Sequence, residues 1–279
     1  METAIAKRKR VQPWRLSLRK YVAVLRVSIA HNLAYMTEIF FRAFMLVIIV
    51  FIMIQLWKTT FSLRGAKALS GFSMSDIVWY LATVEALVMS MPPLTRRIDL
   101  EVRSGQLVYQ LGRPCNYLLY NYAHYLGERL VRLGINIIVV SLLAWSIAGW
   151  PHLTWMGLMA WPLMAWLALS IDFVAYFSIG LLAFWIEETR SLSTIFSRLT
   201  LVLGGVLAPL DIFPQPFRSI AQALPFSAIL YGPASVLIRF DLNRFVGVLG
   251  QQAITLAVGC VILLLVYQVA IRRVNLNGG

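Results

Sequence analysis

The stretch Pro93–Tyr125, PLTRRIDLEVRSGQLVYQLGRPCNYLLYNYAHY, is the longest interruption of hydrophobicity in the interior of the chain. It carries charges of both signs, yet its apolar residues recur three to five positions apart: Ile98, Val102, Leu107 and Leu111. That spacing is close to a helical period and predicts a short amphipathic helix with one apolar side. A long apolar segment precedes the stretch and another follows it.

The composition indicates an integral membrane protein. Of the 279 residues, 59% are hydrophobic and 13% are charged, whereas a soluble domain carries roughly 25% charged residues. The net charge of +13 agrees with basic residues that flank membrane spans on the cytoplasmic side. Nucleic-acid binding is not expected, because no basic face interleaved with aromatic residues lies outside the apolar segments.

Six apolar segments are predicted to cross the membrane as helices, since roughly 20 residues span the hydrocarbon core. We expect an all-α integral membrane protein with one transmembrane domain over residues 32–279. The predicted spans are 35–57, 75–92, 127–147, 155–185, 193–207 and 245–271, with a cytoplasmic loop over 93–125 between the second and the third. The end of this loop, Cys115 to Tyr125, could be either loop or the early third span.

Residues 1–31 are expected to form a basic cytoplasmic tail followed by an amphipathic helix. From Trp14 to His31, apolar residues recur at three and four positions while basic residues face elsewhere. This pattern suits a helix in the plane of the membrane interface. The alternative is a cytoplasmic extension of the first span.

The segment 208–237 cannot form a continuous span, because five prolines interrupt it. Its apolar pieces have the length of interfacial or re-entrant segments, so we expect two short helices that dip into the outer leaflet. The prolines are Pro209, Pro214, Pro216, Pro225 and Pro233.

The distribution of lysine and arginine predicts the orientation. Eight lie in the first 31 residues, six in the region 93–132, two near the loop after the fourth span and two in the C-terminal tail. The loops of the opposite side carry six. By the positive-inside rule, both termini are expected in the cytoplasm.

No catalytic, cofactor-binding or metal-ligating motif is found in the sequence. It contains no GxxxxGK[ST] phosphate loop, no HExxH, no CxxC and no GxSxG. Neither cysteine, Cys115 or Cys260, has a spacing that supports a disulfide framework or a metal site. We therefore expect no enzyme activity, cofactor or metal in this chain.

Two carboxylates, Glu85 and Asp172, fall inside predicted spans, where ionisable groups are costly and often functional. They either line a polar path or bind a cationic substrate group, or else they form interhelical pairs and hydrogen bonds. The pair Gly204-Gly205 either permits close helix packing or loosens the helix before Pro209.

In this order the segments resemble the membrane subunits of type-2 ABC exporters, in the bacterial branch whose permease is a separate six-span chain. Three parts carry the resemblance: the helix Trp14–His31, the sequence EVRSGQL at Glu101–Leu107 with Leu111–Pro114, and the region Gly204–Pro233. The second is similar to the family's "I-R-S-G-x-L…L-L-R-P" loop, although Gly112 replaces an apolar residue.

The resemblance implies the transmembrane subunit of an ATP-driven exporter in the bacterial cytoplasmic membrane. Separate ABC ATPase subunits would bind ATP, and a second permease chain, identical or a sister protein, would complete the path. The implied ATPase-coupling residues are Arg97, Glu101, Arg103, Ser104, Gly105, Leu107, Leu111 and Arg113. The implied path lies along the second and fifth spans, with Glu85 as a candidate in the second and Gly204 and Gly205 at the end of the fifth. Asp172, in the fourth span, is a further candidate for the path because of its place inside the membrane.

Three alternatives remain at this point. The amphipathic helix of the 93–125 loop could lie on lipid headgroups instead of a partner. The whole chain could be a membrane scaffold or assembly protein that transports nothing. It could also be a secondary transporter, although the inverted repeats that usually mark that class are not visible between residues 35–147 and 155–271.

Overall fold

The computed structural model describes residues 13–65, 67–150 and 153–277, and within these ranges it contains helices and no β-strand. Residues 1–12 of the expected basic tail lie outside the described part. In chain order the helices are α1 (Pro13–Ala34), α2 (Met36–Arg64), α3 (Met74–Met89), α4 (Leu94–Arg103), α5 (Gln106–Leu111), α6 (Tyr117–Ala148), α7 (Trp155–Leu181), η1 (Leu182–Phe184), α8 (Thr189–Leu203), η2 (Leu210–Ile212), α9 (Phe217–Ala223), α10 (Pro225–Ile229), α11 (Tyr231–Ile238) and α12 (Leu242–Asn277).

Five helical segments of the described chain are long and apolar enough to cross a membrane: Thr37–Arg64, Met74–Arg103, Tyr117–Ala148, Trp155–Phe184 and Leu242–Arg273. This confirms the all-α membrane class. The expected span 193–207 corresponds to α8, which has 15 residues, fewer than the roughly 20 that a bilayer requires. Five of the six expected crossings therefore correspond to helices that are long enough to span a membrane.

The third span begins earlier than the sequence pattern indicated. α6 starts at Tyr117, where the Asn116 side chain accepts a hydrogen bond from the Leu119 amide at 3.1 Å. Such a cap satisfies one of the amide donors that a helix start leaves without an intrahelical partner. Residues 117–125, for which loop and early third span were both open, are therefore the first turns of α6.

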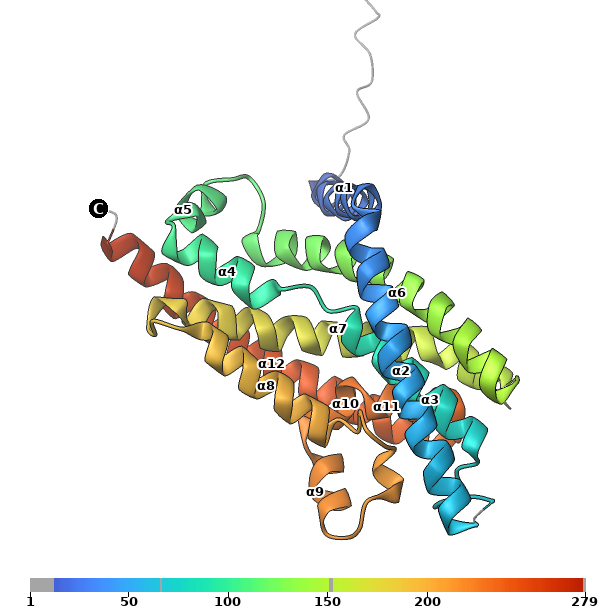
Figure 1. Ribbon diagram of the computed structural model, residues 1–279. Coiled ribbons are helices and arrows are strands. Elements are labelled where there is room, and N and C mark those ends of the chain that lie inside the picture. The colour runs from blue at the N-terminus through green and yellow to red at the C-terminus, as the bar shows by residue number, and fades with distance from the viewer. Residues whose placement is uncertain (1–12, 66, 151–152, 278–279) are drawn as a thin grey trace, which may run out of the picture.

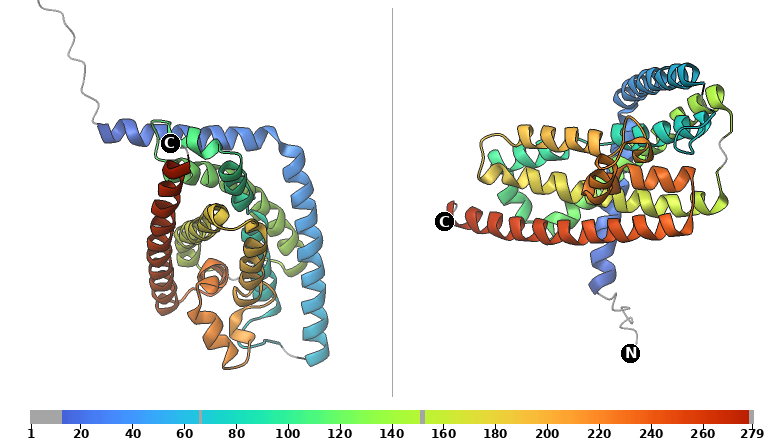
Figure 2. Two further views of the ribbon diagram at one scale, coloured as in Figure 1. Left: turned by 90° about the vertical axis from the view of Figure 1, so that its left-hand side faces the viewer. Right: turned by 90° about the horizontal axis from the view of Figure 1, so that it is seen from below.

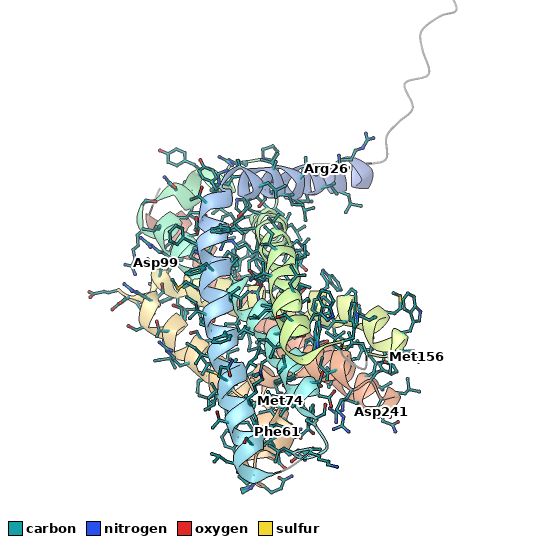
Figure 3. The ribbon with its side chains drawn as sticks, turned by 45° about the vertical axis from the view of Figure 1, so that its right-hand side comes forward. Arg26, Phe61, Met74, Asp99, Met156 and Asp241 are labelled. Atoms are coloured by element: carbon teal, nitrogen blue, oxygen red, sulfur yellow. The ribbon has the colours of Figure 1, made fainter. Side chains whose placement is uncertain are left out.

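The spans run between two ends of the molecule. Figure 1 shows α1, α5 and the end of α12 at one end, and α9 with the α2–α3 connection at the other. Figure 3 places Arg26 and Asp99 at the first end, far from Phe61 and Met74 at the second. We refer to these as the α1 end and the α9 end.

α1 turns away from α2 and crosses the α1 end of the molecule (Figure 2). It lies directly on α6: a Cβ added at Gly127 would stand 2.7 Å from the Leu25 carbonyl oxygen, and Ser28 Oγ donates to the His124 carbonyl at 2.8 Å. The side that packs on α6 is thus small and polar. Large apolar side chains remain exposed along α1 instead: Leu18, Val22, Val27 and Leu33.

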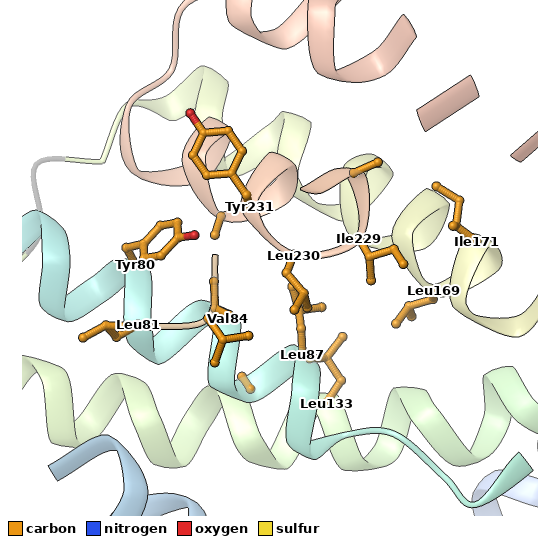
Figure 4. Close-up of a cluster of buried hydrophobic side chains, with 14 of the residues drawn as sticks. Tyr80, Leu81, Val84, Leu87, Leu133, Leu169, Ile171, Ile229, Leu230 and Tyr231 are labelled. Atoms are coloured by element: carbon orange, nitrogen blue, oxygen red, sulfur yellow. The ribbon is translucent and has the colours of Figure 1, made fainter. Parts of the chain in front are cut away.

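α3 and α7 form the centre of the helix bundle. Their most apolar stretches are 78% and 67% buried, against 28% for α2, 28% for α6 and 11% for α12. Figure 4 shows how α3 meets the short helices: Tyr80, Val84 and Leu87 lie beside Leu230 and Tyr231. α2, α6 and α12 therefore present the exposed apolar surface that a lipid or protein partner would cover.

Candidate functional site

The stretch 93–116 forms two helices, α4 and α5, rather than the single helix expected. Gly105 has φ of 71°, a left-handed conformation that glycine adopts without a Cβ clash. At the end of α4 the Leu100 carbonyl accepts from the Ser104 amide at 2.9 Å and from Ser104 Oγ at 2.6 Å. The chain therefore changes direction between Arg103 and Gln106.

The apolar side of this stretch faces the protein's own core. Ile98 and Leu107 are 0% and 2% exposed, and Val102 and Leu111 pack against the same cluster. α4 contacts α7, η1 and α8. The periodic apolar residues thus hold α4 and α5 on the bundle, and the other faces of both helices stay exposed.

Hydrogen bonds join α4 to the connection between α7 and α8. Asp99 accepts from Arg103 Nε at 2.9 Å and from Thr189 Oγ1 at 2.8 Å, and Arg103 Nη2 donates to the Ile186 carbonyl at 3.2 Å. Thr189 is the first residue of α8. A displacement of α4 would therefore pull directly on the start of α8.

Besides Arg103, two of the expected coupling residues, Glu101 and Arg97, make contacts within the chain. Tyr117 Oη donates to the Glu101 carboxylate at 2.6 Å, which links α4 to the start of α6. Arg97 Nη1 donates to His124 Nδ1 at 2.9 Å and lies 3.4 Å from the Glu128 carboxylate. Neither side chain is among the most accessible of the loop.

The accessible residues of α4 and α5 form what we call the α4–α5 surface. Of the expected residues, Arg103, Ser104, Gly105 and Arg113 are exposed. Three large apolar side chains that the sequence analysis did not single out are exposed with them: Leu100 at 55%, Val108 at 54% and Tyr109 at 79%. Apolar and basic groups side by side on a short ordered element are typical of a protein-docking surface.

A polar cavity of about 700 Å³ opens beside this surface at the α1 end. It lies between α2, the α3–α4 turn, the α7–α8 connection and α8. Three basic and three acidic residues are mixed with hydroxyl groups along its wall, so it suits a polar or zwitterionic group better than an apolar one. The lining residues are Arg42, Met91, Pro92, Pro93, Leu94, Thr95, Arg96, Asp99, Leu100, Tyr176, Glu187, Glu188, Thr189, Arg190, Ser193, Thr194 and Ser197.

Asp172 forms a buried ion pair rather than facing this cavity. Its carboxylate lies 2.8 Å from Arg129 Nη1, and the two side chains are 5% and 1% exposed. Arg129 also donates to Tyr125 Oη at 2.6 Å, Ser90 Oγ at 3.1 Å and the Leu87 carbonyl at 3.1 Å. The pair joins α6 to α7 and to the end of α3. Asp172 thus forms an interhelical pair, the alternative to lining a polar path.

Glu85 lies on α3 and is 5% exposed. No hydrogen bond or ion pair from the described residues reaches its carboxyl group. A buried carboxyl group is costly unless it is neutral or has a hydrogen-bonding or charged partner. The functional role expected for Glu85 therefore stays a prediction. Glu85 is absent from the lining of the polar cavity.

Gly204 and Gly205 end α8 where it approaches α3 and α10 closely. A Cβ at Gly204 would stand 3.1 Å from the Phe226 carbonyl oxygen, and one at Gly205 would stand 2.8 Å from Tyr80 Oη. Gly205 also has φ of 76°, and its carbonyl accepts from Tyr80 Oη at 2.7 Å. Both glycines therefore permit close packing between helices.

The segment 208–237 forms η2 and three short α-helices around the carboxylate of Asp211. That group accepts from Arg218 Nη2 at 2.8 Å and from Tyr231 Oη at 2.7 Å, and lies 3.6 Å from Arg244 Nη1. Prolines stand at or before helix starts, where a missing amide costs least: Pro209 precedes η2, Pro214 precedes α9, Pro225 opens α10 and Pro233 lies in the first turns of α11.

No group of three or more histidine, cysteine, aspartate or glutamate side chains with metal-binding geometry is found in the described ranges. Cys115 and Cys260 are both free thiols there.

Comparison with protein families matches residues 45–278 to the family described as ABC-2 family transporter protein. The matched region begins within α2 and runs to the end of α12. No curated protein matches the chain in sequence.

Proposed function

Because the chain belongs to the ABC-2 family of transporter proteins, we propose that it is the permease subunit of an ATP-driven exporter whose ATP hydrolysis takes place on separate subunits. Members of this family are transmembrane components that generally work with ABC ATPase partners. The membrane helices and the family together make this chain a multi-pass transport permease.

The α4–α5 surface is the observation that supports a separate ATPase most directly. Tyr109 is the most exposed of its large apolar side chains. The exposed Arg113 adds positive charge to the same surface, and Arg103, which pairs with Asp99, is exposed there too. An aromatic anchor with flanking arginines is the composition enriched at the centre of protein interfaces. In this proposal the ATPase binds here, and its motion passes through Asp99 and Thr189 to α8.

The proposed topology has six crossings, with both termini in the cytoplasm. The α1 end then faces the cytoplasm, since it carries the loop 93–125 and most of the basic residues. α8 with the residues after Gly204 makes the short fifth crossing, and η2, α9, α10 and α11 form the re-entrant segment of the outer leaflet. The membrane is the bacterial cytoplasmic membrane.

A second permease chain, identical or a sister protein, is proposed to cover α2 and α8. α8 exposes apolar side chains at a helical spacing on one side: Leu192, Ile195, Leu199 and Val202. Its hydroxyl-bearing residues Ser193, Thr194 and Ser197 line the polar cavity. The cavity would then become the cytoplasmic entrance of a path enclosed between two chains, with Glu85 farther along α3.

Coexpression of this chain with candidate ABC ATPase subunits of its organism tests the proposal. Tyr109→Glu places a charge on the exposed α5 face without touching the core, and Leu63→Glu makes the same kind of change at an 83%-exposed position near the α9 end. We expect a stable complex with wild type and with Leu63→Glu, and loss of the complex with Tyr109→Glu. Equal recovery of the ATPase with both variants would contradict the proposed surface.

A further inference from the structure

A charged cluster lies at the α1 end where α2, α4 and α6 meet. It consists of Glu38 and Arg42 on α2, Arg97 on α4, and Glu128 and Arg132 on α6. Three guanidinium groups face two carboxylates, so the cluster carries one positive charge in excess. We call it the α2–α4–α6 cluster.

The Glu128 carboxylate lies between the two inner arginines. Its Oε1 accepts from Arg132 Nη2 at 2.7 Å, and its Oε2 accepts from Arg97 Nη1 at 3.4 Å. The same Arg97 nitrogen donates to His124 Nδ1 at 2.9 Å; since guanidinium has donors only, that imidazole nitrogen is the acceptor. Arg132 lies 4.0 Å from Glu38, the outer carboxylate.

Four guanidinium nitrogens of this cluster are buried and have no hydrogen-bond partner among the described residues: Nε and Nη2 of Arg97, and Nε and Nη1 of Arg132. The Arg132 side chain is 8% exposed. A buried charged donor without an acceptor carries a large desolvation cost, which an anion relieves. Two adjacent guanidinium forks with free donors suit a planar or tetrahedral oxyanion.

The cluster lies beside the crossing of α1 over α6. α1 contacts α6 at His124 and Gly127, directly before Glu128. A helix such as α1, with exposed apolar side chains, lies at the headgroup level of a bilayer. The cluster extends to the exposed surface of α2 through Glu38 and Arg42, whose side chains are 58% and 41% exposed.

We propose that Arg97 and Arg132 bind a phosphate group, and that an anionic phospholipid of the adjoining leaflet supplies it. Basic pockets between transmembrane helices on the cytoplasmic side bind anionic headgroups. Bound phosphate would accept from the free guanidinium donors and balance the excess positive charge. It would also fix α4 and α6 against α1. This proposal rests on the proposed topology, in which the α1 end faces the cytoplasm, and is independent of which subunit hydrolyses ATP.

Binding of fluorescent phosphatidylglycerol to the full-length chain in detergent tests the site, with inorganic phosphate as competitor. Arg132→Gln is expected to weaken binding roughly tenfold, as the loss of one charge-assisted hydrogen bond implies. Glu128→Gln removes the competing carboxylate and is expected to tighten binding. Arg272→Gln removes an exposed positive charge near the end of α12, and its affinity is expected to match wild type.

Arg132→Gln and Glu128→Gln are expected to change the lipid affinity in opposite directions. Damage to the fold would weaken binding in both variants, so the two outcomes separate a binding role from misfolding. If Arg132→Gln does not fold, Arg132→Lys keeps the charge but removes the fork, and is expected to weaken binding as well. Millimolar phosphate that displaces the lipid probe from wild type, but not from the arginine variants, identifies free phosphate as the source. Failure to compete identifies the headgroup. Equal lipid affinity of wild type and all these variants would overturn the proposal.

Discussion

Replacement of Asp172 by asparagine should destabilise the protein severely. The change removes the carboxylate 2.8 Å from Arg129 while the guanidinium stays 1% exposed. Arginine does not deprotonate in proteins, so the buried charge persists without its counter-ion. Loss of one partner of a buried pair costs about 3–5 kcal/mol, a large fraction of the stability of a typical domain.

Unfolding of the purified chain by increasing mole fractions of sodium dodecyl sulfate, followed by tryptophan fluorescence, measures this cost. The double variant Arg129→Met with Asp172→Leu replaces the pair by apolar groups and is expected to be more stable than Asp172→Asn, because no buried charge is left. Asp241→Asn is a matched control at an exposed position, where asparagine caps as well as aspartate. A loss of less than about 1 kcal/mol for Asp172→Asn would refute the structural role assigned to the pair.

Two glycines give further predictions. Gly205→Ala should destabilise the protein by roughly 1–3 kcal/mol in the same unfolding assay, because the residue has φ of 76° and its new Cβ would stand 2.8 Å from Tyr80 Oη. Gly65→Ala, at φ of 59° with nothing within 4 Å of the new Cβ, should destabilise it less. A larger loss of stability for Gly65→Ala than for Gly205→Ala would contradict the packing argument. Gly127→Val should lift α1 from α6, since a Cβ there would stand 2.7 Å from an α1 carbonyl oxygen. Faster trypsin cleavage within α1 would show this, with Gly134→Ala, in open space, cleaved as wild type; unchanged cleavage of Gly127→Val would contradict the contact.

The membrane class and most spans are predictable because apolar runs of about 20 residues have few other uses in a protein. The sequence left the start of α6 open, because Asn121, His124 and Tyr125 lower the hydropathy of turns that are nevertheless helical. Asn121 is satisfied locally, since its amide donates to the Tyr117 carbonyl at 3.0 Å. At the end of a span, hydropathy alone therefore does not distinguish a polar loop from the first turns of a helix.

The candidate site was predictable in location but not in orientation. The spacing of Ile98 and Leu107 shows that they share an apolar side, but periodicity does not say whether that side meets the same chain or a partner. The break at Gly105 then placed Val108 and Tyr109 on the accessible side. Similarly, Arg129 and Asp172 are 43 positions apart in the sequence, and only the packing of α6 on α7 brings them together.

Photo-cross-linking from position 109 tests whether an ABC ATPase binds the α4–α5 surface. A benzophenone amino acid is placed at Tyr109 or, as control, at Leu63, and this chain is coexpressed with its ABC ATPase subunit in membranes. We expect a covalent adduct between the chain and the ATPase from position 109 and none from position 63. Absence of the adduct from position 109, in a complex that still exports substrate on ATP hydrolysis, would contradict this binding site.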